Sequence, residues 1–450
     1  MMRFRTFLKQ LRQYPSAIVG FVIIACLLGI SAYTLVTIPY AEAIARWQGG
    51  EQAWADAPRN AAPIWTDWFT PRDLPNTIIR QSDPASDDVT KSTSTSDGIT
   101  DMTIRLPFDY RADGFPKEIA VFLNAEFEAQ RPFVRLTWHT PDGREIPLTQ
   151  EGAGASQRIN LSQSTELRER FGGIRPEIGL MSDPDASGDR AAVLKGRHEL
   201  VITGVLFEEN ADLDAKLVLY GQVHGLAGTD HRRRDLMFGL MYGTPIALAF
   251  GGGTAIGATI FTFILAAIGA WYRGWVDIII QRITEINLIL PALVILIMVG
   301  VFYSRSLWVL MAVLIGLGIF STGIKTYRAL FLQVRESSYI EAAQSYGAGN
   351  WRVIWRYMLP RVVPTLIPQF VALIPTYIFL EASLAILGLG DPLLPTWGKI
   401  LNNAQDNGAL FQGQYYWILE PAVMLMITGV GFAMFGFALD RIFNPRLRVE

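Results

Sequence analysis

The segment Tyr339–Pro360, with the sequence YIEAAQSYGAGNWRVIWRYMLP, predicts two short helices joined by a tight turn. In its first half, one helical face carries Tyr339, Ala342, Ala343 and Tyr346. Gly347 and Gly349 then permit the turn, because glycine adopts backbone angles that other residues avoid. In the second half, a further face carries Trp351, Ile354, Trp355 and Met358. Leu359 and Pro360 end this helix where a long apolar run begins.

Long apolar runs lie on both sides of this segment. A helix needs about 20 apolar residues to cross the hydrocarbon core of a bilayer. Such runs occur at roughly residues 17–38, 244–270, 283–303, 307–324, 362–389 and 417–439. The chain has 450 residues, of which half are hydrophobic and 18% are charged, so a polar part must accompany the spans. We therefore expect an all-α polytopic membrane protein with six transmembrane helices and an inserted polar domain.

Basic residues indicate the side of the membrane on which each connection lies. The N-terminal Arg3, Arg5, Lys9 and Arg12 have no acidic neighbour, so the positive-inside rule places the N-terminus in the cytoplasm. Six spans return the C-terminus to the same side, and the basic stretch 325–361 also falls inside. The net charge of −2 gives no sign of a nucleic-acid partner.

The first apolar run has a second interpretation. A basic start, an apolar core and Ala41-Glu42-Ala43 are also typical of a cleaved signal peptide. The run is long for a signal core, so we expect it to be retained as a span. Cleavage would leave the rest of the topology unchanged.

Residues 40–235 are polar, lie outside the cytoplasm in this topology, and predict a domain. The domain opens with an aromatic, proline-broken segment containing Trp47, Trp54, Trp65, Trp68 and Phe69. Residues 82–97 are rich in Ser, Thr and Asp and predict a disordered linker. Period-two alternation then predicts strands near residues 102–108, 119–123, 136–138, 158–161, 199–207 and 216–223. Short strands of this kind favour a small β-sandwich.

These features divide the chain into three parts. Residues 1–39 form the cytoplasmic N-terminus and first span, and residues 40–235 form the extracytoplasmic β-rich domain. Residues 236–450 form a five-helix core that contains the cytoplasmic segment 325–361.

Motifs for catalysis or metal binding are missing from the sequence. The four histidines, at positions 139, 198, 224 and 231, lack the close spacing of zinc ligands. We find no G-x-S-x-G, H-E-x-x-H or Walker A pattern. The one cysteine, Cys26, cannot form an internal disulfide. We therefore expect neither an enzyme nor an ATPase, with no catalytic residue, metal or cofactor in this chain.

The segment around Glu341 resembles a known family, the membrane components of binding-protein-dependent ABC importers. Their cytoplasmic signature is E-A-A, three residues, Gly, nine residues and I-x-L-P. Matching positions here are Glu341, Ala342, Ala343, Gly347, Leu359 and Pro360. Tyr357 stands in the isoleucine position, and Arg361 replaces the asparagine that is common after the proline. On its own spacing, the same helix could equally lie on the membrane surface.

Further blocks resemble the dipeptide, oligopeptide and nickel branch of that family, in its second permease. Before the second span, the matching residues are Gly228, Thr229, Asp230, Arg234 and Asp235. Arg233 stands where glycine is usual. The inner loop and third span match at Gly274-Trp275-Val276-Asp277, and the end of the chain matches from Glu381 to Leu384 and from Asp440 to Arg448. The large insertion is not explained by the resemblance.

The resemblance implies a type I permease fold in a bacterial inner membrane, surrounded by lipid. It implies that a second permease completes the pathway, that an extracytoplasmic binding protein delivers substrate, and that two ATPase subunits bind ATP and Mg²⁺. The ATPase-coupling residues would be Glu341, Ala342, Ala343, Gly347, Leu359, Pro360 and Arg328. Candidate pathway residues on the fifth span are Gln369, Tyr377 and Glu381. Peptides are the expected substrates, with nickel chelates or another small solute as alternatives.

Two other functions fit parts of the sequence. A secondary transporter would also show six spans, but it should carry ionisable residues deep in them, and only Glu381 and Glu420 qualify. Both lie near the outer ends of their spans. A membrane-anchored enzyme would use the external domain, which offers no nucleophile or metal constellation.

Overall fold

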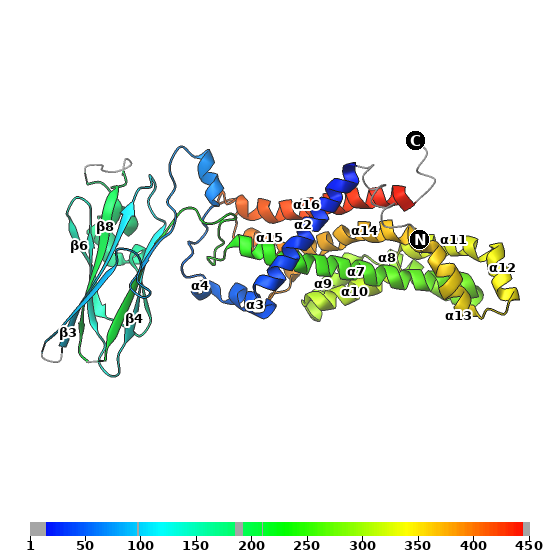
Figure 1. The fold of residues 1–450 in the computed structure, drawn as a ribbon, viewed down its shortest axis with the longest axis horizontal. Coiled ribbons are helices and arrows are strands. Elements are labelled where there is room, and N and C mark those ends of the chain that lie inside the picture. Colours follow the sequence, from blue (N-terminus) through cyan, green and yellow to red (C-terminus); the bar gives the residue numbers. More distant parts are fainter. Residues whose placement is uncertain (1–14, 97–98, 185–191, 209, 444–450) are drawn as a thin grey trace. The chain divides into compact units, whose positions relative to one another are not determined.

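The computed structural model describes residues 15–96, 99–184, 192–208 and 210–443. The chain divides into two compact units. A helical unit comprises residues 1–48 and 238–450, and a second, strand-rich unit comprises residues 49–237 (Figure 1). The second unit begins at Gly49 rather than at the expected residue 40, because the helix α3 (Tyr40–Gln48) belongs with the helical unit.

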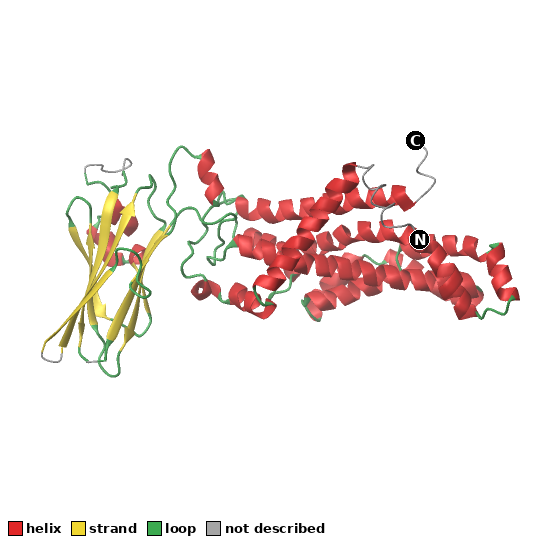
Figure 2. Cartoon of the chain, in the orientation of Figure 1, coloured by secondary structure: helices red, strands yellow, loops and turns green. Residues whose placement is uncertain are grey.

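The strand-rich unit contains two antiparallel sheets (Figure 2). One sheet has the order β1-β9-β4-β7, formed by Ile78–Gln81, Asp212–Tyr220, Glu118–Glu126 and Gln157–Asn160. The other has the order β2-β3-β8-β5-β6, formed by Thr90–Ser96, Ile99–Tyr110, Gly196–Leu206, Phe133–His139 and Glu145–Gly152. Short helices complete the unit: α4 (Gly50–Ala53), η1 (Ile64–Phe69), η2 (Leu161–Gln163), α5 (Thr165–Arg170) and α6 (Pro176–Met181).

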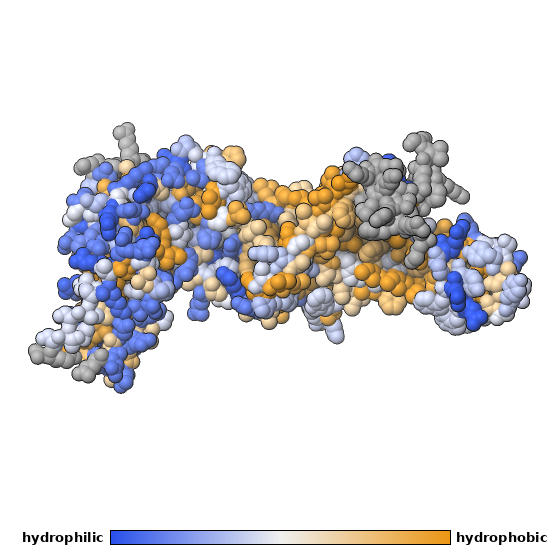
Figure 3. Space-filling model, in the orientation of Figure 1, coloured by the Kyte–Doolittle hydropathy of each residue, from blue (hydrophilic) through white to orange (hydrophobic). Residues whose placement is uncertain are grey.

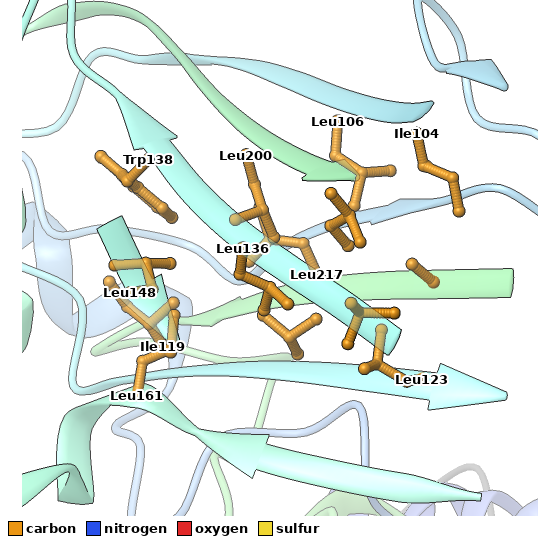
Figure 4. Close-up of a cluster of buried hydrophobic side chains, with 14 of the residues drawn as sticks. Ile104, Leu106, Ile119, Leu123, Leu136, Trp138, Leu148, Leu161, Leu200 and Leu217 are labelled. Atoms are coloured by element: carbon orange, nitrogen blue, oxygen red, sulfur yellow. The ribbon is translucent and has the colours of Figure 1, made fainter. Parts of the chain in front are cut away.

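The core of this unit lies between the two sheets (Figure 4). Alternate residues of β3, β5 and β8 meet alternate residues of β4 and β9, as in Ile104 and Leu200 on one side and Leu123 and Leu217 on the other. Each of these side chains is fully buried. The period-two pattern of the sequence thus predicts a β-sandwich correctly.

The expected linker over residues 82–97 is wrong over its second half. Residues Thr90–Ser96 form strand β2, which pairs with β3 from Thr90 opposite Arg105 to Ser96 opposite Ile99. All seven side chains of β2 are exposed, so this edge strand buries no apolar surface. Backbone hydrogen bonds to β3 and the β-propensity of threonine hold it, and an argument from hydrophobic burial alone misses both.

Among its described residues, the helical unit contains four helices that are long and apolar enough to cross a membrane. They are α2 (Pro15–Thr37), α7 (Leu236–Tyr272), the continuous helical segment Asn350–Leu389, and residues Tyr416–Ile442 of α16 (Tyr416–Phe443). Two bent pairs add up to two more spans: α8 (Gly274–Ile289) with α9 (Ala292–Phe302), and α10 (Leu307–Ile319) with α11 (Thr322–Arg335). Apolar surface covers this unit along most of its length (Figure 3).

Both bends lie inside runs that the sequence presents as single spans. The helices α8 and α9 meet at 77° around Leu290 and Pro291, where the proline keeps the preceding residue extended. The helices α10 and α11 meet at 44° around Phe320 and Ser321. A bilayer offers no hydrogen bonds, so the freed backbone groups need partners within the protein.

Polar side chains provide these partners at both ends of α10. At its first residue, the backbone N–H of Leu307 donates to Asp391 Oδ2 at 3.0 Å. At its last turn, Asn287 Nδ2 donates to the carbonyls of Leu317 and Phe320 at 2.9 and 3.0 Å. The single hydroxyl proton of Thr262 has three carbonyls within reach, that of Ala258 in its own helix at 2.7 Å and those of Ile319 and Gly318 at 2.9 and 3.2 Å. The break between α10 and α11 is therefore a hydrogen-bonded feature of the fold.

Glycines allow the long helices to approach one another closely. A Cβ added at Gly20 of α2 would lie 2.7 Å from the Gly431 carbonyl oxygen of α16. A Cβ added at Gly251 of α7 would lie 2.8 Å from the Ile374 carbonyl oxygen of α14 (Leu359–Leu384). Small residues at such crossings are how membrane helices pack without a hydrophobic driving force. The helix α2 consequently has a close-fitting partner in α16.

The remaining helices pack on this bundle. The π-helical turn η5 (Ala385–Leu389) ends α14, and α15 (Trp397–Asp406) follows. Trp397 is fully buried and its Nε1 donates to the Leu240 carbonyl of α7 at 2.9 Å. Gln48 at the end of α3 donates to the Leu393 carbonyl at 3.2 Å.

Candidate functional site

The segment Ser338–Met358 forms one end of the helical unit (Figure 1). It contains α12 (Ser338–Ser345), α13 (Asn350–Val353) and the π-helical turn η4 (Ile354–Met358), which continues into α14. Two short helices and a turn are thus confirmed. Gly347 has a φ of +79°, in the left-handed region.

A Schellman motif closes α12 at this glycine. The Gly347 N–H donates to the Gln344 carbonyl at 2.8 Å, and the Ala348 N–H donates to the Ala343 carbonyl at 3.0 Å. A Cβ at Gly347 would meet no other atom within 4 Å. Substitution would therefore strain the backbone by about 1 to 2 kcal/mol without a clash inside this chain.

The two helical faces that the spacing predicts are only partly buried. Ala343, Ile354 and Met358 are buried, whereas the other members, Tyr339, Ala342, Tyr346, Trp351 and Trp355, are exposed. Ile340 and Ala343 face inward on α12, and Val353, Ile354 and Met358 face inward on the second helix. Ile340, Val353, Ile354 and Met358 share one hydrophobic cluster with Phe263 of α7 and with Tyr327 and Phe331 of α11. The ion pair between Arg273 and Glu336, at 2.6 Å, ties the start of α8 to the residue that follows α11. The segment is therefore seated on a rigid base.

The outward face of this segment is aromatic and exposed. Tyr346 is 90% exposed, and Tyr339, Trp351 and Trp355 are also exposed. Glu341 and Ala342 lie on the same open face. Among the described residues, the Glu341 carboxylate has no hydrogen bond or ion pair. We call Tyr339, Glu341, Ala342, Tyr346, Trp351 and Trp355 the α12 face. Exposed apolar groups around an unpaired carboxylate are typical of a protein-binding surface.

Of the seven expected coupling residues, only Glu341 and Ala342 belong to the α12 face. Ala343 is buried on the opposite side of α12, and Gly347 and Pro360 lie at the turn and at the start of α14. Arg328 of α11 makes a two-pronged ion pair with Asp277 of α8, in which Arg328 Nε donates to Asp277 Oδ1 at 2.7 Å. Arg328 thus joins α8 to α11 and does not lie on the α12 face. Leu359 is buried at the start of α14, in the cluster beneath the segment.

A polar cavity of about 440 Å³ lies among α7, α14 and the α10–α11 break. Its polar lining residues are Thr259, Thr262, Ser321, Thr322, Thr326, Tyr327, Gln369, Thr376 and Tyr377. None of the described lining residues carries a formal charge. Thr259 is only 3% exposed, and its hydroxyl has no hydrogen-bond partner. The structure thus brings Gln369 and Tyr377 together, whereas Glu381 is buried and does not line the cavity.

The sequence analysis missed the other walls of this cavity. Thr259 and Thr262 are isolated hydroxyls in an apolar run, and such threonines usually bond to their own helix backbone. The break before Thr322 brings α11's first turn to the cavity. In the sequence, only the spacing of Thr259 and Thr262 on one face of α7 could have indicated a polar wall.

The residues Gly228, Thr229, Asp230, Arg234 and Asp235 form a closed turn in the strand-rich unit. Arg234 Nε donates to Asp230 Oδ2 at 2.6 Å, and the Asp235 carboxylate accepts from the Met237 N–H at 2.8 Å. Thr229 Oγ1 donates to the Pro58 carbonyl at 2.7 Å and accepts from the Ala61 N–H at 2.9 Å. Burial lowers the pKa of Arg234, and Asp230 opposes that shift.

Arg233 in this turn has a φ of +65°, which explains why glycine would suit the position. Its guanidinium is 1% exposed and pairs with Glu118 of β4. It also donates to the Ala57 carbonyl at 2.9 Å and lies 4.2 Å from the centre of the Tyr220 ring of β9. Burial raises the pKa of the Tyr220 hydroxyl although Arg233 and Arg158 oppose the shift. Arg233 thus attaches the turn to the β-sandwich.

Comparison with known proteins identifies the family of the helical unit. Residues 243–449 match the family model of binding-protein-dependent transport system inner membrane components. The dipeptide transport permease DppC of Alkalihalophilus pseudofirmus is 31% identical over 224 residues, which are 49% of this chain and 72% of that protein. The chain belongs to this family. The glutathione transport permease GsiD of Pectobacterium atrosepticum is 29% identical over the same length and coverage.

Membership confirms the resemblance that rests on Glu341, Ala342, Ala343 and Gly347, and it makes the chain a multi-pass membrane permease of the peptide-transport branch. The matched residues 243–449 comprise both the α12 face and the cavity. The β-sandwich lies before them, in residues 49–237.

The contacts of Arg233 predict that Arg233→Gly destabilises the strand-rich unit. Loss of a largely buried ion pair costs about 3 kcal/mol, and relief of left-handed strain returns about 1 kcal/mol. The net loss of about 2 kcal/mol should lower the melting temperature by roughly 4 to 8 °C in calorimetry of the purified chain.

The matched control is Arg232→Gly, since Arg232 is exposed and its backbone N–H keeps the bond to Asp230. The control should shift the melting temperature much less. Equal shifts would mean that added chain flexibility, and not the Arg233 contacts, explains the loss.

Proposed function

We propose that this chain is one of two permease subunits of an ATP-driven ABC importer, and that the α12 face couples it to an ATPase subunit. The observation that carries the proposal is the exposed, aromatic α12 face, which holds Glu341 and Ala342 of the family signature on a buried base. A groove on a partner would bury this aromatic area, and a basic group there would pair with Glu341.

The rigid base supports a mechanical role for the segment. Ile340 and Val353 share one cluster with α7 and α11, and η4 continues directly into α14. A partner that moves the α12 face therefore pulls on three helices that surround the cavity. In the proposed cycle, closure of two ATPase subunits switches the cavity between inward and outward access. ATP and Mg²⁺ bind to those partner subunits, and this chain is non-catalytic.

The uncharged cavity supports a role as part of the translocation pathway. Gln369, Thr376 and Tyr377 offer donors and acceptors without a fixed charge, which suits substrates that must bind weakly and leave. A second permease subunit would close the open side of this cavity. We propose peptides as the substrate class, because the relatives are named for dipeptide and glutathione transport. A binding protein would deliver them at the outer face.

We further propose six spans in a bacterial inner membrane, with both termini and the α12 face in the cytoplasm. Each bent pair then counts as one span. The tight packing of Gly20 on Gly431 supports retention of the first span. The β-sandwich is then extracytoplasmic. Although three arginines, 232 to 234, lie on that outer side, two of them are neutralised by Glu118 and Asp230.

The topology predicts which engineered cysteines react in intact cells. In a Cys26→Ser background, Gln405→Cys lies on an exposed position of α15, on the proposed outer side. It should be labelled by a membrane-impermeant maleimide, whereas Asn350→Cys at the start of α13 should be labelled only after lysis. The reverse pattern would refute the orientation.

The cavity predicts a transport defect from the loss of a single hydroxyl. Thr376→Val should lower kcat/KM for peptide uptake by about fivefold in proteoliposomes with the partner subunits, since one lost hydrogen bond costs about 1 kcal/mol. Thr365→Val is the matched control, because Thr365 lies on the same helix, is equally exposed, and does not line the cavity. Identical kinetics of the two variants would remove the cavity from the pathway.

The α12 face predicts loss of coupling without loss of assembly in the membrane. Glu341→Lys reverses the charge that faces the ATPase, and a charge-assisted bond worth about 1.5 to 3 kcal/mol gives way to repulsion. Co-purification of the ATPase should weaken at least tenfold, and ATP hydrolysis should no longer respond to loaded binding protein.

The control is Gln333→Lys, which adds a lysine on the exposed side of α11 outside the α12 face. It should transport normally. If Glu341→Lys also transported normally with stimulated ATP hydrolysis, the coupling role would be wrong and a helix on the membrane surface would be preferred.

A further inference from the structure

An exposed apolar patch lies on the strand-rich unit, at η1 and the loop before α7. It consists of Ile64, Trp65, Trp68, Phe69 and Leu226, and we call it the η1 patch. Trp68 is 83% exposed, Phe69 is 80% exposed and Leu226 is 67% exposed. Full exposure of two large aromatic side chains to water is unfavourable, at about 25 cal/mol per Å² of apolar surface. The patch therefore calls for an apolar contact outside this chain.

The η1 patch is held in one conformation. The Thr70 N–H donates to the Asp67 carbonyl at 3.0 Å, and the Leu74 N–H donates to Asp67 Oδ1 at 3.0 Å. The rings of Trp65 and Phe69 meet edge to face with centroids 6.4 Å apart. The Asp67 carboxylate is thus occupied by the turn itself, and the aromatic side chains are presented as a preformed surface.

Hydrogen bonds attach the η1 patch to the beginning of α7. The Ile64 N–H donates to the Gly225 carbonyl at 2.9 Å, and Trp65 Nε1 donates to the Leu226 carbonyl at 2.9 Å. Two residues later, the Gly228 carbonyl accepts from the N–H of Leu236 at 3.0 Å. Leu236 is the first residue of α7. The patch and the first turn of a transmembrane helix therefore belong to one hydrogen-bonded assembly.

The start of α7 lies at the edge of the membrane. The charged residues Arg232–Asp235 come directly before Leu236, and the next eight residues, 236–243, carry no charge. A change from charged to apolar sequence of this kind marks the boundary between headgroups and hydrocarbon. Gly228 bonds directly to Leu236, so the loop that carries Leu226 and binds η1 begins beside this boundary. Tryptophan is favoured at that depth, because its apolar ring and its polar N–H both find a partner there.

We propose that the η1 patch inserts into the headgroup region of the bilayer and anchors the β-sandwich to the membrane surface beside α7. The partner is lipid, because the patch lies beside the point where α7 enters the bilayer. A protein partner would have to occupy space that lipid already fills. The inference requires that α7 crosses the membrane, which follows from family membership. It does not depend on the proposed coupling role of α12.

The test measures the depth of a spin label in the full chain. In a Cys26→Ser background, Trp68→Cys is labelled and the chain is placed in nanodiscs of phosphatidylethanolamine and phosphatidylglycerol. Power saturation compares the access of oxygen, which concentrates in lipid, with that of a water-soluble nickel chelate. Ile174→Cys is the matched control, because Ile174 is an exposed apolar residue of the same unit away from the patch.

Oxygen should dominate at position 68 and the nickel chelate at position 174, so the depth parameter should change sign between them. Phe69→Cys should behave like Trp68→Cys, which guards against a local effect of losing the tryptophan. Equal access of the nickel chelate at positions 68, 69 and 174 would overturn the proposal. Shielding that arises only when the second permease or a binding protein is added would also overturn it, in favour of a protein interface.

Discussion

Hydrocarbon offers the backbone no hydrogen bonds, and the helical unit depends on meeting that constraint at its breaks. Leu307 at the start of α10 binds the Asp391 carboxylate, and the last carbonyls of α10 accept bonds from Asn287 and Thr262. Three separate elements therefore support one short helix. Because these bonds satisfy the break between α10 and α11, the polar cavity beside it can exist within an apolar bundle.

The segment Ser338–Met358 is held by apolar packing, whereas the break beside α10 is held by hydrogen bonds. Its inner residues join a hydrophobic cluster with α7 and α11, while aromatic side chains and Glu341 remain open to solvent. The Schellman motif at Gly347 sets the angle between the two short helices through two local backbone hydrogen bonds. A locally determined turn on a rigid base gives the face a fixed shape. Such a surface loses little conformational entropy when a partner binds.

The β-sandwich is attached through a turn that closely resembles its family's pattern. Asp230, Arg234 and Thr229 keep the turn closed, and Arg233 reaches from it to Glu118 and Tyr220 in the two strands β4 and β9. An arginine in a left-handed conformation is costly, and its buried contacts offset that cost. Arg233 thus joins this turn to both strands within the strand-rich unit.

Sequence alone determined the family, the apolar runs and the β-sandwich, because apolar periodicity and short signatures are local properties of the chain. Gly347 illustrates this, since its left-handed turn follows from residue type. Tertiary structure decided what depends on partners distant in sequence. Strand β2 forms because β3 is available to pair with it, and Arg328 joins α8 because Asp277 lies opposite. Gln369 and Tyr377 share a cavity that excludes Glu381, because packing of α7, α11 and α14 places only the first two at its wall.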